Sequence, residues 1–332
     1  LGVACLGMTL VNAPIALLAG FFSIRLLGQG SMSLSSGTLV PQWFIRKRGR
    51  ALSLVSLGGA ASSALLPPLN TWMIGAYGWK MGWTVWAVLL WAVMVPMAYL
   101  VIRDKPENVG LSPDGEGNRR DLVEVNPVPE ESWTVREAVK TRSFWLLLFC
   151  VMVPSAIVTG LIFHHISIMG QTGIDAQAAA AVLSTMAIVR LPVVLVTGQI
   201  ADRASPRLLQ ATSLGLLLLS MAVLLFINSV QTAVLYGVLT GIMMAFQSIV
   251  SGVIWPIYYG RRHLGSIRGL TMMAGVIGSA LGPLPYGFAY DLYGGYHEAF
   301  VLSLIFPLIG VAAALLAKRP ERTASSRGNS YS

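Results

Sequence analysis

Long apolar stretches separated by short charged turns dominate this sequence. The clearest is 177–200, which is built almost entirely of apolar or small residues and holds a single arginine, Arg190. A helix of that length crosses the roughly 30 Å hydrocarbon core of a bilayer. Comparable stretches lie at 15–40, 51–75, 82–102, 143–169, 208–228, 231–256, 268–291 and 297–317. The pattern predicts an all-α integral membrane protein.

Composition and charge support this prediction. The chain is 55% hydrophobic and only 11% charged, whereas a soluble domain carries about 25% charged residues. The net charge of +9 could indicate nucleic-acid binding, but its distribution argues against that. All of the Lys and Arg except Arg25, Lys80 and Arg190 fall in alternate loops and the C-terminal tail. This is the positive-inside bias, so we expect no nucleic-acid partner, a plasma or inner cell membrane location and a cytoplasmic C-terminus.

The sequence offers no sign of an enzyme. Cys5 and Cys150 both lie in apolar runs, where two cysteines predict neither a disulfide framework nor a metal site. There is no nucleotide-binding loop, and no Ser/His/Asp, Cys/His or paired-carboxylate set falls in one plausible site. We therefore expect no catalytic residues, no cofactor and no ATP-driven step.

The apolar pattern breaks between residues 103 and 142, where charges of both signs mix with Pro, Gly and Asn. We expect a solvated cytoplasmic linker there, with a short amphipathic helix begun by a Thr134–Glu137 capping box. The predicted organisation is a first set of membrane helices over 1–102, this linker, and a second set over 143–317. A disordered cytoplasmic tail is expected over 318–332.

An internal repeat relates the two sets of helices. Arg50-Ala-Leu52, followed by Pro67, recurs without gaps as Arg268-Gly-Leu270, followed by Pro285. The sequence therefore predicts two related halves in the same orientation.

Two motifs carry a resemblance to a known family. The turn after 177–200, Gly198-Gln-Ile-Ala-Asp202-Arg203-Ala-Ser-Pro-Arg207, resembles the G-x-x-x-D-R-x-x-x-R loop of the major facilitator superfamily. The linker phrase from Pro106 to Gly115 is similar to one that follows the sixth helix in its oxalate/formate-antiporter-like and monocarboxylate-transporter-like branches. The resemblance implies a secondary transporter with two pseudo-symmetric six-helix bundles. If 143–317 is one bundle (helices 7–12), then 1–102 supplies helices 3–6 of the other. About ten of twelve helices would be present, and the first two would be missing upstream.

Arg190 is the strongest substrate-binding candidate. A charge near the middle of a membrane helix costs a few kcal/mol, so it should face a cavity and mark a substrate path. In the two branches named above, an arginine on the corresponding eighth helix binds the substrate carboxylate, and a guanidinium can do so with two parallel hydrogen bonds. A lysine like that of oxalate transporters on the eleventh helix is absent, because Arg268 lies at the cytoplasmic edge. The alternative is that Arg190 pairs with an acid or with carbonyls of a neighbouring helix.

Further candidates lie in other spans. Arg25 could be a second cationic anchor or a structural bond between helices. The neutral polar or aromatic residues at membrane depth could contact substrate or join helices. The polar ones are Asn70, Gln247, Ser248 and Ser251, and the aromatic ones are Trp255, Tyr286 and Tyr290.

The motif turn is the candidate for gating, and a histidine pair is the candidate for proton coupling. Gly198, Asp202, Arg203 and Arg207 could latch the cytoplasmic side during alternating access, or form an ordinary solvated turn. His164 and His165 could pass protons or simply lie at the membrane interface, and this pair alone predicts no metal site.

Together these features predict a secondary active transporter of a small organic anion, with a monocarboxylate expected, driven by proton coupling or exchange. Its partners would be the anionic substrate and the lipid bilayer, and we expect a monomer. One alternative is an exporter of lipophilic drugs or cations, which would prefer a buried acid. The other is a non-transporting membrane sensor or a truncated, inactive product.

Overall fold

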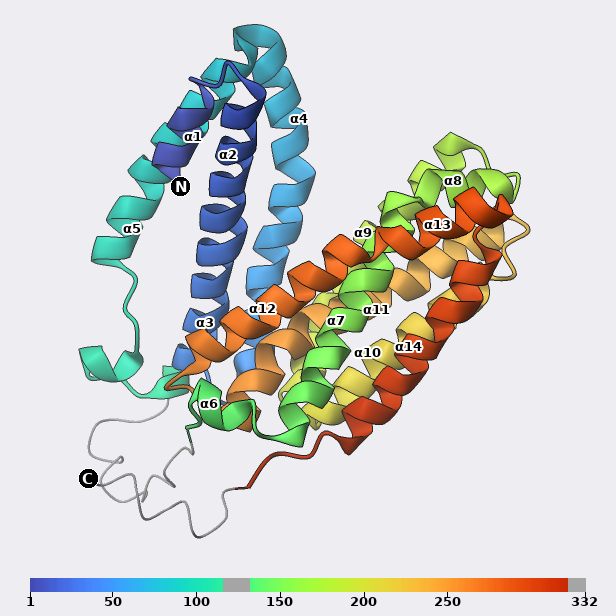
Figure 1. Cartoon of the computed structure of the whole chain (residues 1–332). Coiled ribbons are helices and arrows are strands. Elements are labelled where there is room, and N and C mark those ends of the chain that lie inside the picture. The colour runs from blue at the N-terminus through green and yellow to red at the C-terminus, as the bar shows by residue number, and fades with distance from the viewer. Residues whose placement is uncertain (116–131, 322–332) are drawn as a thin grey trace. The chain divides into compact units, whose positions relative to one another are not determined.

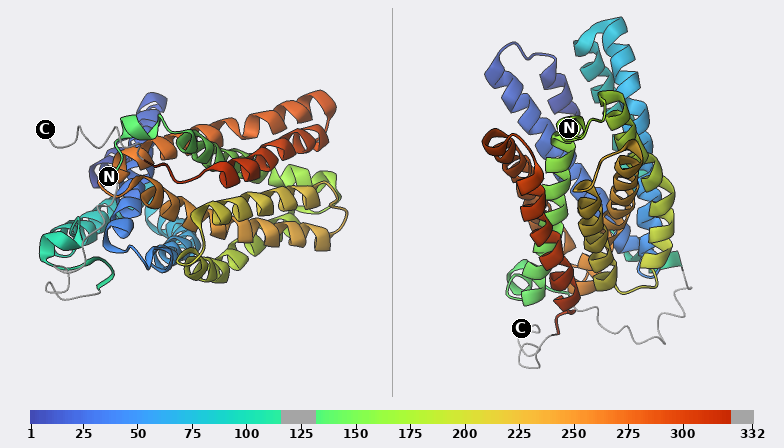
Figure 2. Two further views of the ribbon diagram at one scale, coloured as in Figure 1. Left: turned by 90° about the horizontal axis from the view of Figure 1, so that it is seen from below. Right: turned by 90° about the vertical axis from the view of Figure 1, so that its right-hand side faces the viewer.

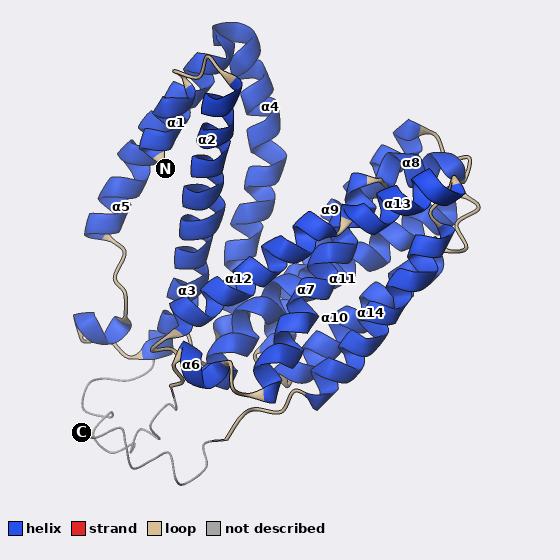
Figure 3. Cartoon of the chain, viewed as in Figure 1, coloured by secondary structure: helices blue, strands red, loops and turns tan. Residues whose placement is uncertain are grey.

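The computed structural model describes residues 1–115 and 132–321. Within these ranges all regular structure is helical and no strand occurs (Figure 3). The chain divides into two compact units, Leu1–Val128 and Pro129–Ser332. The middle of the predicted linker and most of the predicted tail, 116–131 and 322–332, lie outside the described residues. For the described residues, the all-α prediction is confirmed.

The N-terminal unit consists of α-helices with π-helical and 3-10 segments between and after them. Its α-helices are α1 (Gly2–Met8), α2 (Pro14–Ile24), α3 (Ser33–Trp43), α4 (Arg48–Leu89) and α5 (Val95–Leu100). Two π-helical segments, Arg25–Met32 and Leu90–Met94, join α2 to α3 and α4 to α5. Two short 3-10 turns, Pro106–Val109 and Pro113–Gly115, follow α5. Inside α4, Gly78 has φ 81°, a conformation that glycine adopts without steric cost. The predicted spans 51–75 and 82–102 therefore meet at this residue.

The C-terminal unit follows the predicted spans closely. Its helices are α6 (Val135–Ala138), α7 (Arg142–Phe163), α8 (His165–Gln171), α9 (Ala176–Ala201), α10 (Pro206–Leu224), α11 (Val230–Tyr259), α12 (Leu264–Leu281), α13 (Pro283–Tyr293) and α14 (His297–Leu316). Two spans are divided. His164, at φ −96° and ψ 6°, separates α7 from α8. Pro283 begins α13, since a proline has no N–H to continue the ladder of α12.

Side-chain caps begin several of these helices. Thr141, Asp175 and Ser229 each accept a hydrogen bond from the backbone N–H three residues further on, at the start of α7, α9 and α11. The predicted capping box of Thr134 and Glu137 is confirmed at the start of α6. The polar residues that precede each apolar run thus fix where its helix starts.

Close helix pairs form the core of the C-terminal unit. In Figures 1 and 2, α9 runs beside α11, α7 beside α12, and α10 beside both α11 and α14. Two glycines make these approaches possible. A Cβ on Gly241 of α11 would lie 2.6 Å from the backbone oxygen of Met186, and one on Gly278 of α12 would lie 2.8 Å from that of Met152. Small residues at crossings are how membrane helices achieve contact.

Among the described residues, eight helical segments are long and apolar enough to cross a membrane. They are Pro14–Trp43, Leu69–Leu100, Arg142–Phe163, Ala176–Ala201, Pro206–Leu224, Val230–Tyr259, Leu264–Tyr293 and His297–Leu316. The predicted span 51–75 is not a separate member of this set, because it belongs to α4, which continues through Gly78 to Leu89. Multiple spans make this a multi-pass membrane protein.

Candidate functional site

A cavity of about 340 Å³ lies among the membrane helices of the C-terminal unit. Its walls come from α7, α9, α11 and α12, and its lining carries one charged side chain, that of Arg190. The apolar part of the wall is Val151, Pro154, Val158, Met243 and Met244. The polar part is Ser155, Thr159, Gln247, Ser248 and Ser251. The cavity is therefore an open, mainly apolar pocket with one cation in its wall.

Arg190 lies on α9, two residues before Pro192, and is half-buried. Within the part of the chain that the structure describes, its guanidinium makes no hydrogen bond and no ion pair. Within the described residues of the C-terminal unit, no acid and no carbonyl of a neighbouring helix holds Arg190. In the described membrane helices of this unit, the acids Asp291 and Glu298 lie near helix ends. A cation in an apolar cavity is a strong attractor for an anionic ligand.

Gln247 shares this cavity with Arg190. Its Oε1 accepts hydrogen bonds from Gln210 Nε2 at 3.0 Å and from Ser213 Oγ at 3.1 Å. The structure thus brings two of the predicted substrate-binding residues together.

Four hydroxyl residues also line the wall. Ser248 and Ser251 are among the neutral polar residues that the sequence predicts at membrane depth, whereas Ser155 and Thr159 were not singled out. Ser155 Oγ donates to the carbonyl of Gly275 at 2.6 Å, and Ser248 and Ser251 donate to carbonyls three residues earlier. Thr159 Oγ1 lies 2.9 Å from Ser279 Oγ. A hydroxyl within an apolar helix usually satisfies its own backbone, so no pattern in the sequence marks Ser155 and Thr159 as facing a cavity.

The other predicted substrate residues lie elsewhere. In the N-terminal unit, Asn70 Oδ1 accepts a hydrogen bond of 2.6 Å from Trp86 Nε1, which joins the two arms of α4 on either side of Gly78. Arg25 is the first residue of the π-helical segment Arg25–Met32, a kind of distortion that often accompanies functional sites. In the C-terminal unit, Tyr286 does not line the Arg190 cavity. It is 1% exposed and packs against Phe300, with ring centroids 6.0 Å apart.

The two histidines have different surroundings. His164 Nε2 lies 3.2 Å from the carbonyl of Pro283, and its Nδ1 lies 3.4 Å from the hydroxyl of Tyr296. His165, beyond the end of the membrane helix α7, is 1% exposed, and its Nε2 lies 2.9 Å from the carbonyl of Ala179. Because a carbonyl only accepts, Nε2 of His165 carries the hydrogen. Burial lowers the pKa of His165 and so favours the neutral ring.

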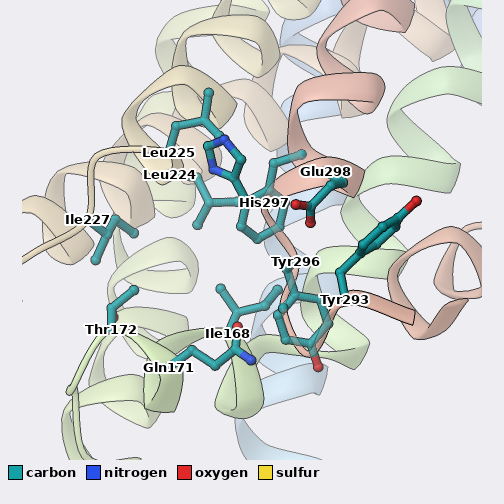
Figure 4. Close-up of a pocket in the computed structure, with 12 residues that line it drawn as sticks. Ile168, Gln171, Thr172, Leu224, Leu225, Ile227, Tyr293, Tyr296, His297 and Glu298 are labelled. Atoms are coloured by element: carbon teal, nitrogen blue, oxygen red, sulfur yellow. The ribbon is translucent and has the colours of Figure 1, made fainter. Parts of the chain in front are cut away.

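A second pocket, of about 370 Å³, lies at the end of this unit where α8, α10 and α14 meet their loops (Figure 4). Its wall includes Gln171, Thr172, Tyr296, His297 and Glu298. Tyr296 donates a hydrogen bond of 2.8 Å to Ser167 and so ties the pocket to the His164 region. None of the predicted substrate-binding residues lines it.

The motif turn connects α9 to α10. Gly198 is buried near the end of α9, and Asp202 follows the last residue of that helix. Arg203 and Arg207 are exposed, and Pro206 begins α10. The model of the Major Facilitator Superfamily matches residues 1–236 and again 166–330. The chain belongs to the major facilitator superfamily.

Members of the major facilitator superfamily are membrane transporters of small molecules, not enzymes. Residues 166–236 fall within both matches. The curated proteins compared with this chain include no match to it. Membership of this family establishes a multi-pass secondary transporter. The class of its substrate must be inferred from the residues of the site.

Proposed function

We propose that this member of the major facilitator superfamily is a secondary active transporter of a small organic anion, most specifically a monocarboxylate. The observation that carries the proposal is Arg190, a guanidinium without a partner among the described residues of the C-terminal unit, in a 340 Å³ cavity of that unit's membrane helices. A ligand carboxylate would supply the missing negative charge.

The chemistry of the cavity favours this class. A guanidinium binds a carboxylate through two parallel charge-assisted hydrogen bonds. A volume of about 340 Å³ is near the lower end of the ~300–1,000 Å³ range of small-molecule sites, which favours a small ligand. With one cation in the wall, a single carboxylate is neutralised, whereas a second carboxylate would need another. A lipophilic cation would meet the charge of Arg190 and be repelled.

The transport cycle that we propose is alternating access, driven by proton coupling or by exchange of anions. Asp202, Arg203, Arg207 and Gly198 are the proposed cytoplasmic latch. His164 is the better-placed of the two histidines for carrying protons, because both of its ring nitrogens face polar atoms. We propose a monomer in the plasma or inner membrane with its C-terminus in the cytoplasm.

Uptake into proteoliposomes tests the proposal. The purified full-length protein would be supplied with labelled butyrate, lactate, oxalate or tetraphenylphosphonium, with and without a pH gradient. Arg190→Gln would be compared with Arg262→Gln, a matched change of an exposed arginine in the same unit. We expect saturable uptake of a monocarboxylate that is lost in Arg190→Gln and kept in Arg262→Gln.

Two results would contradict the proposal. Movement of tetraphenylphosphonium without carboxylate uptake, unchanged in Arg190→Gln, would indicate a cation exporter. Absence of transport of all four compounds by folded wild-type protein would favour the other alternative, a non-transporting sensor or an inactive product.

A further inference from the structure

A buried polar cluster lies directly behind the wall of the Arg190 cavity. Gln210 and Ser213, on α10, are 1% and 0% exposed, and neither lines the cavity. Both donate hydrogen bonds to Oε1 of Gln247, which does line it. Buried polar groups between apolar helices are costly unless they are satisfied, so this cluster fixes one arrangement of side chains.

Pro154 determines how the side-chain amides in this cluster are oriented. Pro154 has no N–H, so the carbonyl of Cys150, four residues earlier on α7, loses its usual helical donor. Gln210 Nε2 lies 3.4 Å from that carbonyl oxygen. A carbonyl can only accept, so Gln210 must present its nitrogen to α7.

The same nitrogen then determines the orientation of the Gln247 amide. The second hydrogen of Gln210 Nε2 is donated to Gln247 across 3.0 Å, so Gln247 must present its oxygen. The single hydroxyl hydrogen of Ser213 has two acceptors in reach, Gln247 Oε1 at 3.1 Å and the carbonyl of Met243 at 3.5 Å. The shorter contact is the one to Gln247, so Ser213 fills the other lone pair of that oxygen. Hence the nitrogen of Gln247, with two hydrogens, is the end of this side chain that remains for the cavity.

We infer that Gln210 and Ser213 are positioning residues, which hold Gln247 so that its Nε2 donates to the substrate beside Arg190. This inference rests on the proposed function and specifies its ligand. The hydroxyl hydrogens of Ser155, Ser248 and Ser251 go to backbone carbonyls. Thr159 is paired with Ser279 Oγ at 2.9 Å, a hydrogen bond in which either hydroxyl can donate. Apart from that hydroxyl, the donors facing the cavity are one guanidinium and one amide, which suit the two oxygens of one carboxylate.

The apolar part of the wall determines which kind of group the rest of the ligand can be. The same cavity is also lined by Val151, Val158, Met243 and Met244. A short apolar chain would contact them favourably, whereas a second carboxylate there would lose its water without gaining a cation. The site therefore selects a monocarboxylate with a short apolar tail, for which butyrate is the probe and oxalate the contrast.

Transport kinetics with butyrate test the positioning role. Gln247→Met removes the donor and should raise KM about tenfold, the effect of losing one hydrogen bond to a charged group. Gln210→Met frees the Gln247 amide to turn and should raise KM about threefold to tenfold with little change in Vmax. Gln231→Met, at an exposed position of α11, is the matched control and should leave KM unchanged.

The double variant distinguishes positioning from mere packing. If Gln210 acts only through Gln247, the pair of substitutions together should raise KM no more than Gln247→Met alone. Ser213→Ala, a milder change, should raise KM about twofold to threefold. An unchanged KM in Gln210→Met and Ser213→Ala, or additive effects in the double variant, would overturn the inference. Loss of uptake in Arg190→Gln under those results would leave the proposed function standing, whereas normal uptake in Arg190→Gln would remove both.

Discussion

The crossing of α9 and α11 gives a prediction that links packing to transport. Gly241→Ala would place a Cβ 2.6 Å from the backbone oxygen of Met186 and 3.2 Å from its Cα, whereas ordinary contact begins at 3.4 Å. The helices must then separate by roughly 0.8 Å, the difference between 3.4 and 2.6 Å. A gap of that size forfeits about a quarter to a half of each dispersion contact along the seam.

The expected cost follows from two opposing terms. Overpacking of a tight interface costs about 1–3 kcal/mol, and replacing glycine by alanine within a helix returns up to about 1 kcal/mol. We predict a net loss of about 1–2 kcal/mol in the free energy of unfolding. Gly215→Ala on α10 is the control, because nothing lies within 4 Å of its Cβ position. That variant should be as stable as wild type or slightly more stable.

The same displacement should reach the cavity. Arg190 lies one helical turn beyond Met186 on α9, and Gln247 lies on α11. Their separation should grow, so KM for butyrate should rise in Gly241→Ala and not in Gly215→Ala. Thermal unfolding in detergent and uptake into proteoliposomes measure the two effects. If Gly241→Ala matched Gly215→Ala in both, the reasoning from this contact would be refuted.

Two further predictions concern other parts of the chain. The Asp114 carboxylate accepts hydrogen bonds from the backbone N–H groups of Ile45, Arg46 and Lys47. Asp114→Ala should lower the local stability of this basic loop by about 1–2 kcal/mol and so speed tryptic cleavage there. An unchanged cleavage rate would contradict the contact. Burial lowers the pKa of His165 in the folded protein, so its contribution to stability should be present above about pH 6.5 and be lost as the pH falls through the folded pKa. His165→Gln should flatten that pH dependence of the melting temperature, and an identical pH profile in the two proteins would count against it.

Much of the helical framework could be read from the sequence, because apolar length and polar caps decide it locally. The stretch 177–200 became α9, Ala176–Ala201, with Asp175 as its cap. A lone arginine in such a stretch also indicated a cavity in advance, since the alternative is an unpaired charge facing lipid.

The arrangement around Arg190 could not be read in the same way. Gln210 and Ser213 are two polar residues in an apolar run, and nothing in their spacing shows that both point at Gln247. Their orientation depends on a carbonyl of α7 left free by Pro154, which is a property of three packed helices. Tyr286 shows the converse. The sequence leaves open whether this aromatic residue at membrane depth contacts substrate or joins helices, and the structure buries it against Phe300.

The central claim is that a positive charge at position 190 holds the substrate, and chemical restoration of that charge tests it most directly. The two native cysteines are buried, and both would be replaced by alanine before Arg190→Cys is introduced. Uptake of butyrate would then be measured after treatment with aminoethyl, methyl or sulfonatoethyl methanethiosulfonate. The account predicts that uptake is lost in Arg190→Cys and partly restored only by the aminoethyl reagent, which adds a cation. Equal uptake after all three treatments would contradict it.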